Sequence, residues 1–480
     1  MEKRINKILL VNPPGTIFVQ PDGTKQVKDC PPPLGLAYLA AQFSGKYDIQ
    51  VYDMAIEGFG NEKRISDNTI LFGDDFLKLD KLLADYNPDL VGASCILSNR
   101  SRAVLEICNR VKKVNREIIT VVGGHHASAL PSHILQGNAD FVLAGEADHS
   151  FLDLIHRLNN REDISGVSGL AYRKSGQIVV QPKTDFVEDL DSLPFPAWDI
   201  VGLEKYWGKI PMGIPLMDEK YAVVNASRGC PHICKYCAVP THTGIKNFRP
   251  RSINLIRSEL EFLVNKYGIG EVQFTDDNFF VGRNRIKEIC KMLSSNFRGM
   301  HFAVPTGTDL GTLDCDIIDH LQEAGFHYIL LGIETGDLDI QGRFVDKRID
   351  LDKTRRLVEY LKQAKIKASG GFMMGFPGET REQVQRTIDL ATSLDLDKVY
   401  FIMVTPLPGS QLYDFCMEKG LLYPDFNVEE IRYSSTFIAN PNIPRQELEE
   451  LRRSEWKKYM KKQGQDIQAY DNRGWTGFKT

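Results

Sequence analysis

Short, continuously apolar segments rich in β-branched residues recur along this chain and alternate with amphipathic segments. Runs of this kind suit strands that are buried on both faces of a parallel sheet. Strands that alternate with crossover helices predict an α/β, doubly wound (Rossmann-like) domain over residues 1–160, with its ligand at the carboxyl ends of the strands. Five runs in this part of the chain are predicted strands: Lys7–Asn12, Ile49–Met54, Leu90–Cys95, Ile119–Gly124 and Asp140–Glu146.

A second series of apolar segments begins at Tyr221. Six strands alternate here with helices such as 252–267, for which Ser252 is a plausible N-cap and Gly268 a stop. Six β/α repeats over residues 216–426 predict a partial barrel with its chemistry at the strands' carboxyl ends. Between the two domains, residues 161–215 are expected to form a hairpin and a linker, and residues 427–480 a small helical C-terminal region.

The charge balance and the cysteine count narrow the function classes. Lysine and arginine number 59 against 63 for aspartate and glutamate, a formal net charge of −4, so we expect no nucleic-acid partner. The apolar run near the N-terminus is too short for a signal peptide, and no run approaches the length of a membrane span. Nine cysteines, six of them scattered singly, do not form a disulfide framework, and we expect a cytoplasmic protein.

Three cysteines, Cys230, Cys234 and Cys237, follow the first predicted barrel strand with the spacing C-x3-C-x2-C. A structural zinc site requires four ligands, usually in paired C-x2-C spacing, so zinc would need His232 as the fourth. Three structural thiols in a polar loop are a further alternative, although free cysteines prefer burial. A 4Fe–4S cluster needs thiolates at only three corners and leaves its fourth iron open to a substrate. The spacing favours this cluster.

The same spacing, with an aromatic residue before the last cysteine, resembles the radical S-adenosylmethionine (SAM) enzymes. In that family the open iron binds SAM, and one electron from the cluster cleaves SAM to methionine and a 5′-deoxyadenosyl radical. Segments at later strand ends, "FTDDN", "GIETG" and "GGFMMGFPGET", are similar to SAM-contacting segments of the family. Arg249 and Arg251 are candidates to face a carboxylate, with solvated surface as the alternative. The resemblance implies SAM contacts at Tyr236, Thr275, Asp276, Asp277, Glu334, Gly371 and Gly375.

The first domain resembles the cobalamin-binding branch of that family, through segments such as "PPPLGLAYLAA" and "GGHHASALP", and the linker segment "DLDSLPFPAWD" is similar to that branch as well. One departure concerns the Asp-x-His-x-x-Gly motif that ligates cobalt, because Ala55 occupies the histidine position after Asp53. We therefore expect no protein histidine beneath cobalt at this position. The resemblance implies cobalamin contacts at Pro14, Gly35, Leu36, Asp53, Ser94, Gly123, Gly124, His125, Gly145 and Glu146. A bulky side chain at Gly124 is expected to block the corrin.

The resemblance implies a cobalamin-dependent radical SAM C-methyltransferase, with a 4Fe–4S cluster, SAM and cobalamin as cofactors. Its substrate would be a small natural-product or phosphonate-like molecule, and a flavodoxin or ferredoxin would supply electrons. A cobalamin-binding radical SAM cyclase or ring-rearranging enzyme shares the same motifs and remains an alternative. A non-catalytic cobalamin sensor or carrier would not need an open iron, so the three cysteines argue against it. No catalytic side chain is assigned.

Replacing Cys230, Cys234 or Cys237 by alanine should abolish both the cluster and SAM cleavage, because a methyl group cannot replace a corner thiolate. Iron content and 5′-deoxyadenosine release, measured after anaerobic reconstitution, check this expectation. Cys30→Ala is the control and should keep its iron. Full iron and activity in any of the three loop variants would contradict the ligand assignment.

Overall fold

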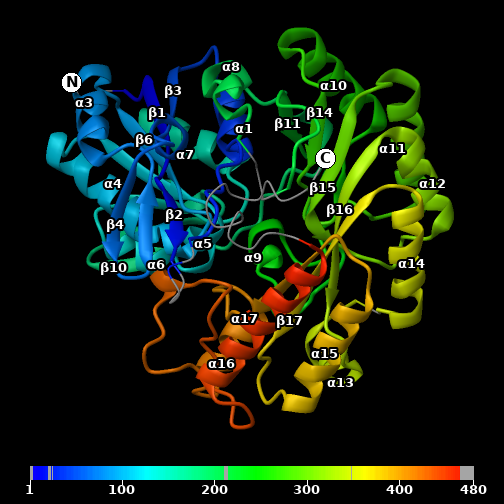
Figure 1. Ribbon diagram of the computed structural model, residues 1–480. Helices are drawn as coiled ribbons and strands as arrows, with labels where there is room; N and C mark the ends of the chain where they lie inside the picture. The colour runs from blue at the N-terminus through cyan, green and yellow to red at the C-terminus, as the bar shows by residue number, and fades with distance from the viewer. Residues whose placement is uncertain (1–3, 20–22, 24, 210–213, 348, 465–480) are drawn as a thin grey trace. The chain divides into compact units, whose positions relative to one another are not determined.

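The computed structural model describes residues 4–19, 23, 25–209, 214–347 and 349–464 (Figure 1). The chain divides into two compact units. The first comprises Met1–Tyr206, Thr241–Gly244 and Asn427–Ile431, and the second comprises Trp207–Pro240, Ile245–Phe426 and Arg432–Thr480. In the described ranges, no helix has both the length and the apolar character that crossing a membrane requires.

The first unit contains a seven-stranded sheet in the order β10-β9-β8-β7-β6-β1-β3. Strands β3, β1, β6, β7 and β8 are parallel, and the predicted hairpin β9–β10 extends the sheet in antiparallel fashion. The order of the parallel strands reverses between β1 and β6, which is where open α/β sheets bind ligands. The doubly wound prediction is confirmed. The strands are β1 (Lys7–Asn12), β3 (Asp48–Asp53), β6 (Leu90–Ser94), β7 (Ile119–Gly123), β8 (Phe141–Leu143), β9 (Leu170–Lys174) and β10 (Gln177–Val180).

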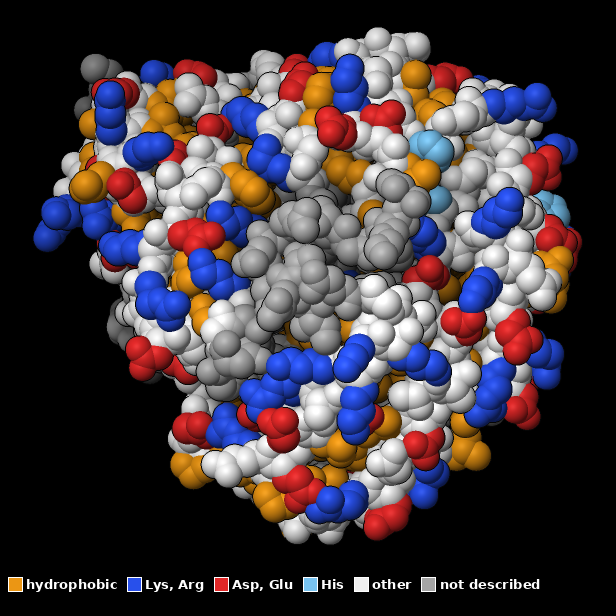
Figure 2. Space-filling model, in the orientation of Figure 1, with side chains coloured by type: hydrophobic (Ala, Val, Ile, Leu, Met, Phe, Trp, Pro, Cys, Tyr) orange, Lys and Arg blue, Asp and Glu red, His pale blue; other side chains and the backbone are white. Residues whose placement is uncertain are grey.

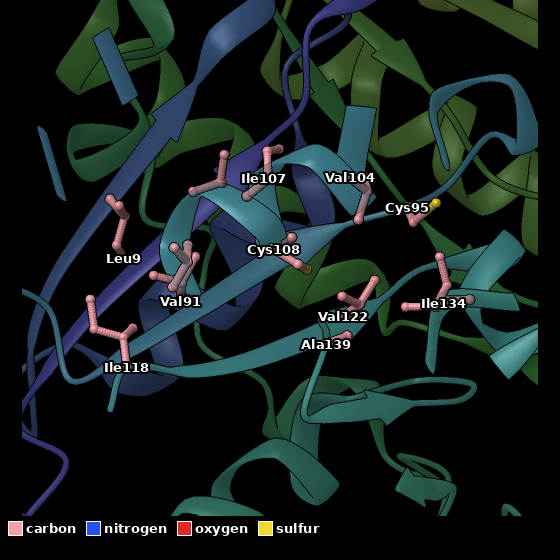
Figure 3. Close-up of a cluster of buried hydrophobic side chains, with 14 of the residues drawn as sticks. Leu9, Val91, Cys95, Val104, Ile107, Cys108, Ile118, Val122, Ile134 and Ala139 are labelled. Atoms are coloured by element: carbon pink, nitrogen blue, oxygen red, sulfur yellow. The ribbon is translucent and has the colours of Figure 1, made fainter. Parts of the chain in front are cut away.

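Two hydrophobic cores lie on the two faces of this sheet. In β1, Leu9 belongs to one core and Leu10 to the other, which explains why the strand is continuously apolar. Figure 3 shows the first core, where Val104 and Ile107 of a helix pack with Leu9 and the strand residues around it. The main helices of the unit are α1 (Leu34–Phe43), α3 (Phe76–Tyr86), α4 (Ser101–Val114) and α7 (Asp148–Asn160).

A small antiparallel sheet in the first unit was not predicted from the sequence. It has the strand order β2-β5-β4, with β2 at Gly15–Phe18, β5 at Thr69–Phe72 and β4 at Glu62–Ser66. All five residues of β4 are exposed, so this strand lacks the apolar pattern by which strands are predicted. The other outer strand of this sheet, β2, begins at Gly15, where an added β-carbon would lie 2.1 Å from the Phe72 ring. Gly15 is therefore a packing glycine.

The second unit contains six parallel strands in the order β11-β14-β15-β16-β17-β18, which confirms the partial barrel. Helices follow the strands as predicted: α10 begins after the N-cap Ser252, whose hydroxyl accepts a hydrogen bond from Leu255 N at 3.1 Å, and ends at the left-handed Gly268. The strands are β11 (Tyr221–Val224), β14 (Glu271–Phe274), β15 (His301–Thr308), β16 (Phe326–Glu334), β17 (Lys367–Met374) and β18 (Lys398–Met403).

The remaining elements are the helices of the barrel, the C-terminal helix α17 (Arg445–Lys462) and several short helices and strands. The linker segment around residues 189–201, expected to lack regular structure, contains a short 3-10 helix and the single-turn helix α8. The other bounds are α2 (Met54–Glu57), α5 (His125–Ala129), α6 (Pro131–Leu135), α8 (Trp198–Val201), β12 (Ser227–Arg228), α9 (Val239–Thr243), β13 (Arg249–Pro250), α10 (Ile253–Tyr267), α11 (Arg283–Asn296), α12 (Cys315–Ala324), α13 (Leu338–Phe344), α14 (Leu351–Gln363), α15 (Arg381–Ser393) and α16 (Gln411–Glu418).

Helix α17 packs on the barrel, as the sequence predicted. Its Tyr459 hydroxyl donates a hydrogen bond to Leu396 O at 2.7 Å, just before β18. In the view of Figure 2, basic and acidic side chains are interspersed over most of the face, and basic ones gather where α17 lies. Acidic neighbours on the same helix partly compensate that charge, for example Glu455 beside Lys458. This is the pattern of a solvated helix packed on one side.

Arg249 and Arg251 are both buried, so the sequence-based alternative that they are solvated surface is wrong. Arg251 forms an ion pair with Glu259 of α10, and its Nη1 also donates to Asn225 O at 2.9 Å. Burial raises the pKa of Glu259, which the charge of Arg251 opposes. Arg251 therefore joins α10 to the segment that follows β11 and holds the base of the cysteine loop.

Arg251→Met should lower the free energy of unfolding of the full chain by about 3–5 kcal/mol, because it leaves the Glu259 carboxylate buried without its cation. Denaturant unfolding of the purified protein measures the change. The control is Arg257→Met on the same helix, whose ion pair with Glu261 is half-exposed and should be worth about 0–1 kcal/mol. Equal losses of unfolding free energy in the two variants would show that the buried ion pair stabilises the protein no more than the half-exposed pair does.

Candidate active site

The three cysteines lie in the loop between β12 and α9, at the carboxyl end of the barrel strands. Cys234 is buried, and Cys230 and Cys237 are half-buried. Among the described residues, no three His, Cys, Asp or Glu side chains are close enough together to hold a single metal ion. His232, the fourth ligand that zinc would need, instead hydrogen-bonds Asp309 at 3.1 Å. Three thiols in one loop match a cubane cluster, which takes each thiolate at a different iron and needs thiolates at only three corners.

Residues of the segment that follows β14 are hydrogen-bonded to the residues that lead into the cysteine loop. Asp276 is fully buried and accepts hydrogen bonds from Ala226 N at 3.0 Å and from the Ser227 hydroxyl. Burial raises the pKa of Asp276 to about 6, and the charge of Arg285 acts in the opposite direction. Because its oxygens are engaged by the loop, Asp276 acts here as an anchor of the cysteine segment.

The neighbours of Asp276 also bond to the loop. Asp277 accepts from Gly229 N at 2.8 Å, and the Thr275 hydroxyl donates to Asn225 Oδ1 at 2.7 Å. Asn278, which the sequence-based site did not include, donates its amide to Cys230 Sγ at 3.8 Å. An amide donor to a cluster sulfur is a typical way in which proteins tune such sites. That Thr275, Asp276 and Asp277 contact SAM stays a prediction.

Glu334, at the end of β16, lies beside two residues that approach it from other elements. Lys347 Nζ forms an ion pair with Glu334 Oε1 at 2.7 Å, and both side chains are about nine-tenths buried, with 10% and 11% of their surface exposed. Tyr236 from the cysteine loop hydrogen-bonds Glu334, and burial together with this carboxylate raises the pKa of Tyr236 well above its ordinary value. Lys347 was missed in the sequence, since it follows a helix and lies 110 residues from the last cysteine.

The surroundings of the three thiols oppose their ionisation, so a nearby positive charge is needed to stabilise the thiolates. Burial raises the pKa of Cys230 and Cys234, and raises that of Cys237 to about 12. Lys347 acts in the opposite direction on all three, so its ammonium group lies within electrostatic reach of each thiol. Iron supplies the remaining charge when thiolates ligate a cluster. The residues present therefore fit a cluster.

The two predicted SAM glycines of the fifth strand have different environments. An added β-carbon at Gly371 would meet only Leu331 O, at 3.8 Å, so β17 leaves room for a ligand to approach its backbone there. Gly375 has a φ of +90° and forms a turn closed by Glu379, which accepts from Gly375 N at 2.6 Å and Phe376 N at 3.0 Å. Gly371 fits a ligand contact, whereas Gly375 is explained by the turn.

In the first unit, the predicted cobalamin residues gather at the carboxyl ends of the strands. Ser94 and Gly123 are paired at the ends of β6 and β7, beside the point where the strand order reverses. Just after β6, Ile96 and Leu97 expose 48% and 44% of their surface. Exposed apolar side chains beside an open glycine are what a flat macrocycle would cover. Gly35, on α1, also has no neighbour within 4 Å of an added β-carbon.

In the segment that resembles the cobalt-ligating motif, the side chains of Asp53 and Ala55 are packed inside the protein. Ala55 is completely buried, and an added β-carbon at Gly73 would lie 3.0 Å from its Cα. Asp53 caps α2 by accepting from Ala55 N at 3.0 Å, and it also accepts from the Tyr206 hydroxyl at 2.7 Å. No imidazole can reach a ligand from position 55, and the Asp53 carboxylate is engaged within the protein.

The other predicted cobalamin residues divide into exposed and buried ones. His125 is exposed and its ring lies 4.2 Å from that of His242. The neighbouring His126 is buried: it hydrogen-bonds Ser98 and His133, and burial lowers its pKa to about 4. Gly145 N donates to Ser128 Oγ at 2.8 Å, which ties the ends of β7 and β8 together. Buried in the described structure are Pro14, Leu36 and Glu146.

Comparisons with known proteins agree with this division of the chain. Residues 224–391 match the radical SAM superfamily, and residues 23–155 match the B12 binding domain. An uncharacterized methyltransferase of Pyrococcus horikoshii is 29% identical over 87% of this chain and 85% of its own length. The cytidylyl-2-hydroxyethylphosphonate methyltransferase of Streptomyces wedmorensis is 27% identical over 92% of this chain and 87% of its own length.

A relative that is named as a cyclase and a solved structure are also similar to this chain. The anaerobic magnesium-protoporphyrin IX monomethyl ester cyclase of Rubrivivax gelatinosus is 25% identical over 90% of this chain and 75% of its own length. The structure of the radical SAM methyltransferase TsrM from Kitasatospora setae, with cobalamin and a 4Fe–4S cluster bound, has a TM-score of 0.67 at 17% identity. It covers 91% of this chain and 83% of its own, and it shows the same fold.

The chain belongs to the cobalamin-binding radical SAM enzymes, whose cofactors are a 4Fe–4S cluster, SAM and cobalamin. Within that family it falls in the methyltransferase-like branch.

The expectation that a bulky residue at Gly124 tests the corrin face needs correction. Gly124 has a φ of +103°, and an added β-carbon would lie 2.7 Å from the Cys95 backbone, so any side chain there would disturb the fold itself. Gly123 is the better position, because its added β-carbon would make only an ordinary contact with Leu143 O at 3.7 Å.

Gly123→Trp should abolish cobalamin binding and methylation while sparing the cluster and the cleavage of SAM to 5′-deoxyadenosine. The indole would occupy the strand-end face of the first unit, whereas the cluster ligands belong to the second unit. Visible absorbance measures bound cobalamin, and chromatography measures 5′-deoxyadenosine. Gly166→Trp, at an exposed turn of the same unit, is the control and should bind cobalamin normally. Full cobalamin occupancy in folded Gly123→Trp protein would place the corrin elsewhere.

Proposed function

We propose that this enzyme is a cobalamin-dependent radical SAM C-methyltransferase that methylates a carbon atom of a small molecule. The observation that carries the proposal is the three-thiol loop at the end of the first barrel strand. It provides Cys230, Cys234 and Cys237 as cluster ligands, while His232 is engaged by Asp309. A cluster held by three residues keeps one iron open, which a catalytic SAM site requires and a structural cluster does not.

When bound, the cluster and SAM would supply a carbon-centred radical, and cobalamin would supply the methyl group. The protein's own residues position these groups. Glu334 and Gly371 line the strand ends next to the cysteine loop, one offering a carboxylate and the other an open backbone. Ser94, Gly123 and Leu97 present a partly apolar face in the first unit. Their role is to bind, orient and exclude water, because the cofactors carry the reactive chemistry.

The buried Ala55 supports methyl transfer to carbon. A histidine at this position would offer its imidazole as a ligand to cobalt, and here neither the side chain nor the packing around it allows one. We therefore propose that cobalt has no protein ligand on this side. An electron paramagnetic resonance spectrum of the Co(II) form that showed nitrogen splitting from a protein ligand would contradict this.

For the substrate we propose a small natural-product precursor of phosphonate type. The support is the similarity over 92% of the chain to a methyltransferase named for cytidylyl-2-hydroxyethylphosphonate. A second candidate function is a cyclase or ring rearrangement, which the similarity over 90% of the chain to a magnesium-protoporphyrin ester cyclase favours. A flavodoxin- or ferredoxin-type protein is the proposed electron donor.

The test is anaerobic reconstitution with iron, sulfide and cobalamin, followed by reaction with methyl-labelled SAM and dithionite. Cytidylyl-2-hydroxyethylphosphonate is the first probe substrate, and other small phosphonates follow. A methyltransferase releases 5′-deoxyadenosine and transfers the label to carbon of the product, as mass spectrometry would show. A cyclase would release 5′-deoxyadenosine with an unlabelled product from a porphyrin ester, and a sensor would release none. Cys234→Ala protein is the matched negative control.

A further inference from the structure

We propose that Lys347 is a positioning residue of the cluster and SAM site: it orients the Glu334 carboxylate and places a fixed positive charge beside the cysteine loop. The inference rests on the cluster assignment made under the proposed function. It adds a residue that lies outside every motif by which the site was found in the sequence.

The ion pair between Lys347 and Glu334 is buried, which distinguishes it from the chain's surface pairs. Its atoms are 2.7 Å apart and its side chains are only 10% and 11% exposed. By contrast, the pair between Lys362 and Asp395 exposes 64% and 56% of its side chains. Removing one member of a buried pair leaves the other charge without compensation, whereas exposed pairs have little effect. Glu334 therefore depends on Lys347 for the orientation of its carboxylate.

The backbone of β16 is adapted to this pair. Glu334 has a φ of +66°, a left-handed conformation that is strained for a residue with a side chain. Two residues earlier, an added β-carbon at Gly332 would lie 2.8 Å from Glu334 Oε1 and 3.0 Å from Lys347 Nζ. The strand thus bends to aim Glu334 and leaves out one side chain to admit the ammonium group. Such strain persists only where the surrounding contacts hold it in place.

The charges around the cysteine loop give Lys347 a second effect. Besides Glu334, the carboxylates of Asp309 and Asp277 act on this region, and His232 hydrogen-bonds Asp309. The segment just before Lys347 is hydrogen-bonded to the cysteine loop on both sides of Cys234, since Ile233 N donates to Asp346 Oδ2 at 3.0 Å and Lys235 N donates to Phe344 O at 2.9 Å. A reduced cluster carries one more negative charge than an oxidised one, so a nearby buried cation favours reduction. Losing Lys347 should therefore make the cluster harder to reduce.

Three substitutions separate these effects. Lys347→Met removes the charge and the hydrogen bond, Lys347→Gln keeps a hydrogen-bond donor without the charge, and Lys347→Arg keeps the charge. Lys362→Met is the matched control, since it removes a paired lysine at the exposed surface of the same unit. All are made in the full chain and reconstituted anaerobically. The readouts are iron content, the midpoint potential of the cluster from a titration followed by electron paramagnetic resonance, and the affinity for SAM.

We expect Lys347→Met to bind iron but to show a more negative midpoint potential and an affinity for SAM weaker by about 10–100-fold, the usual effect of removing an outer partner of a metal site. Lys347→Gln should show the shifted potential with a smaller loss of affinity. Lys347→Arg should recover the potential, and Lys362→Met should behave as the unmodified protein.

The outcomes separate this inference from the proposed function. If the unmodified protein forms the cluster and cleaves SAM, and folded Lys347→Met matches it in potential and SAM affinity, the role of Lys347 is refuted while the function stands. If Lys347→Met does not fold, Lys347→Gln decides by the same two readouts. If the unmodified protein forms no cluster, both the proposed function and this inference fail.

Discussion

Burial of the parallel strands on both faces is the constraint on which both units depend. Strands in this position are mainly apolar, so most polar and charged residues are excluded from their interior, with Glu271 and Gln273 of β14 as exceptions. Polar and charged residues accumulate instead in the loops that follow the strands. In the barrel this places the cysteine loop, Asp276 and Glu334 at one edge of the sheet, although they lie far apart in the sequence. The chemistry of the enzyme is thus concentrated where the packing constraint ends.

This constraint also explains how much of the fold could be predicted from the sequence. The bounds of β1 agree with the prediction residue for residue and those of α10 to within one residue, because the apolar pattern of each reflects its packing directly. Strand β4 escaped prediction because it is exposed throughout and is stabilised by pairing with β5 rather than by burial. Pairing with a distant strand leaves no periodic signal in the local sequence.

The same distinction applies to the site. The three cysteines could be predicted as cluster ligands because they share one loop and show a fixed spacing. Lys347 could not be found in this way: its contact with Glu334 depends on how the chain returns to β16 after α13, and any of many lysines could have supplied the charge. Asp276 was found, but its anchoring contacts to Ala226 and Ser227 appear only in the folded barrel. Spacing thus identifies ligands that share one loop, while their supporting partners require the tertiary structure.

The first unit is built from three segments that lie far apart in the sequence, and this affects how the protein folds during its synthesis. This unit includes Thr241–Gly244 and Asn427–Ile431, segments that follow the first and the last barrel strands. Asn427–Ile431 is bound through Glu429, which pairs with Arg102 at 2.8 Å, a contact that spans 327 residues of sequence. Contacts of such separation form late, because a long loop must close first. On the ribosome the first unit emerges early yet lacks its last segment until the barrel strands have been synthesised. The two units are therefore products of one folding process and not modules completed in turn.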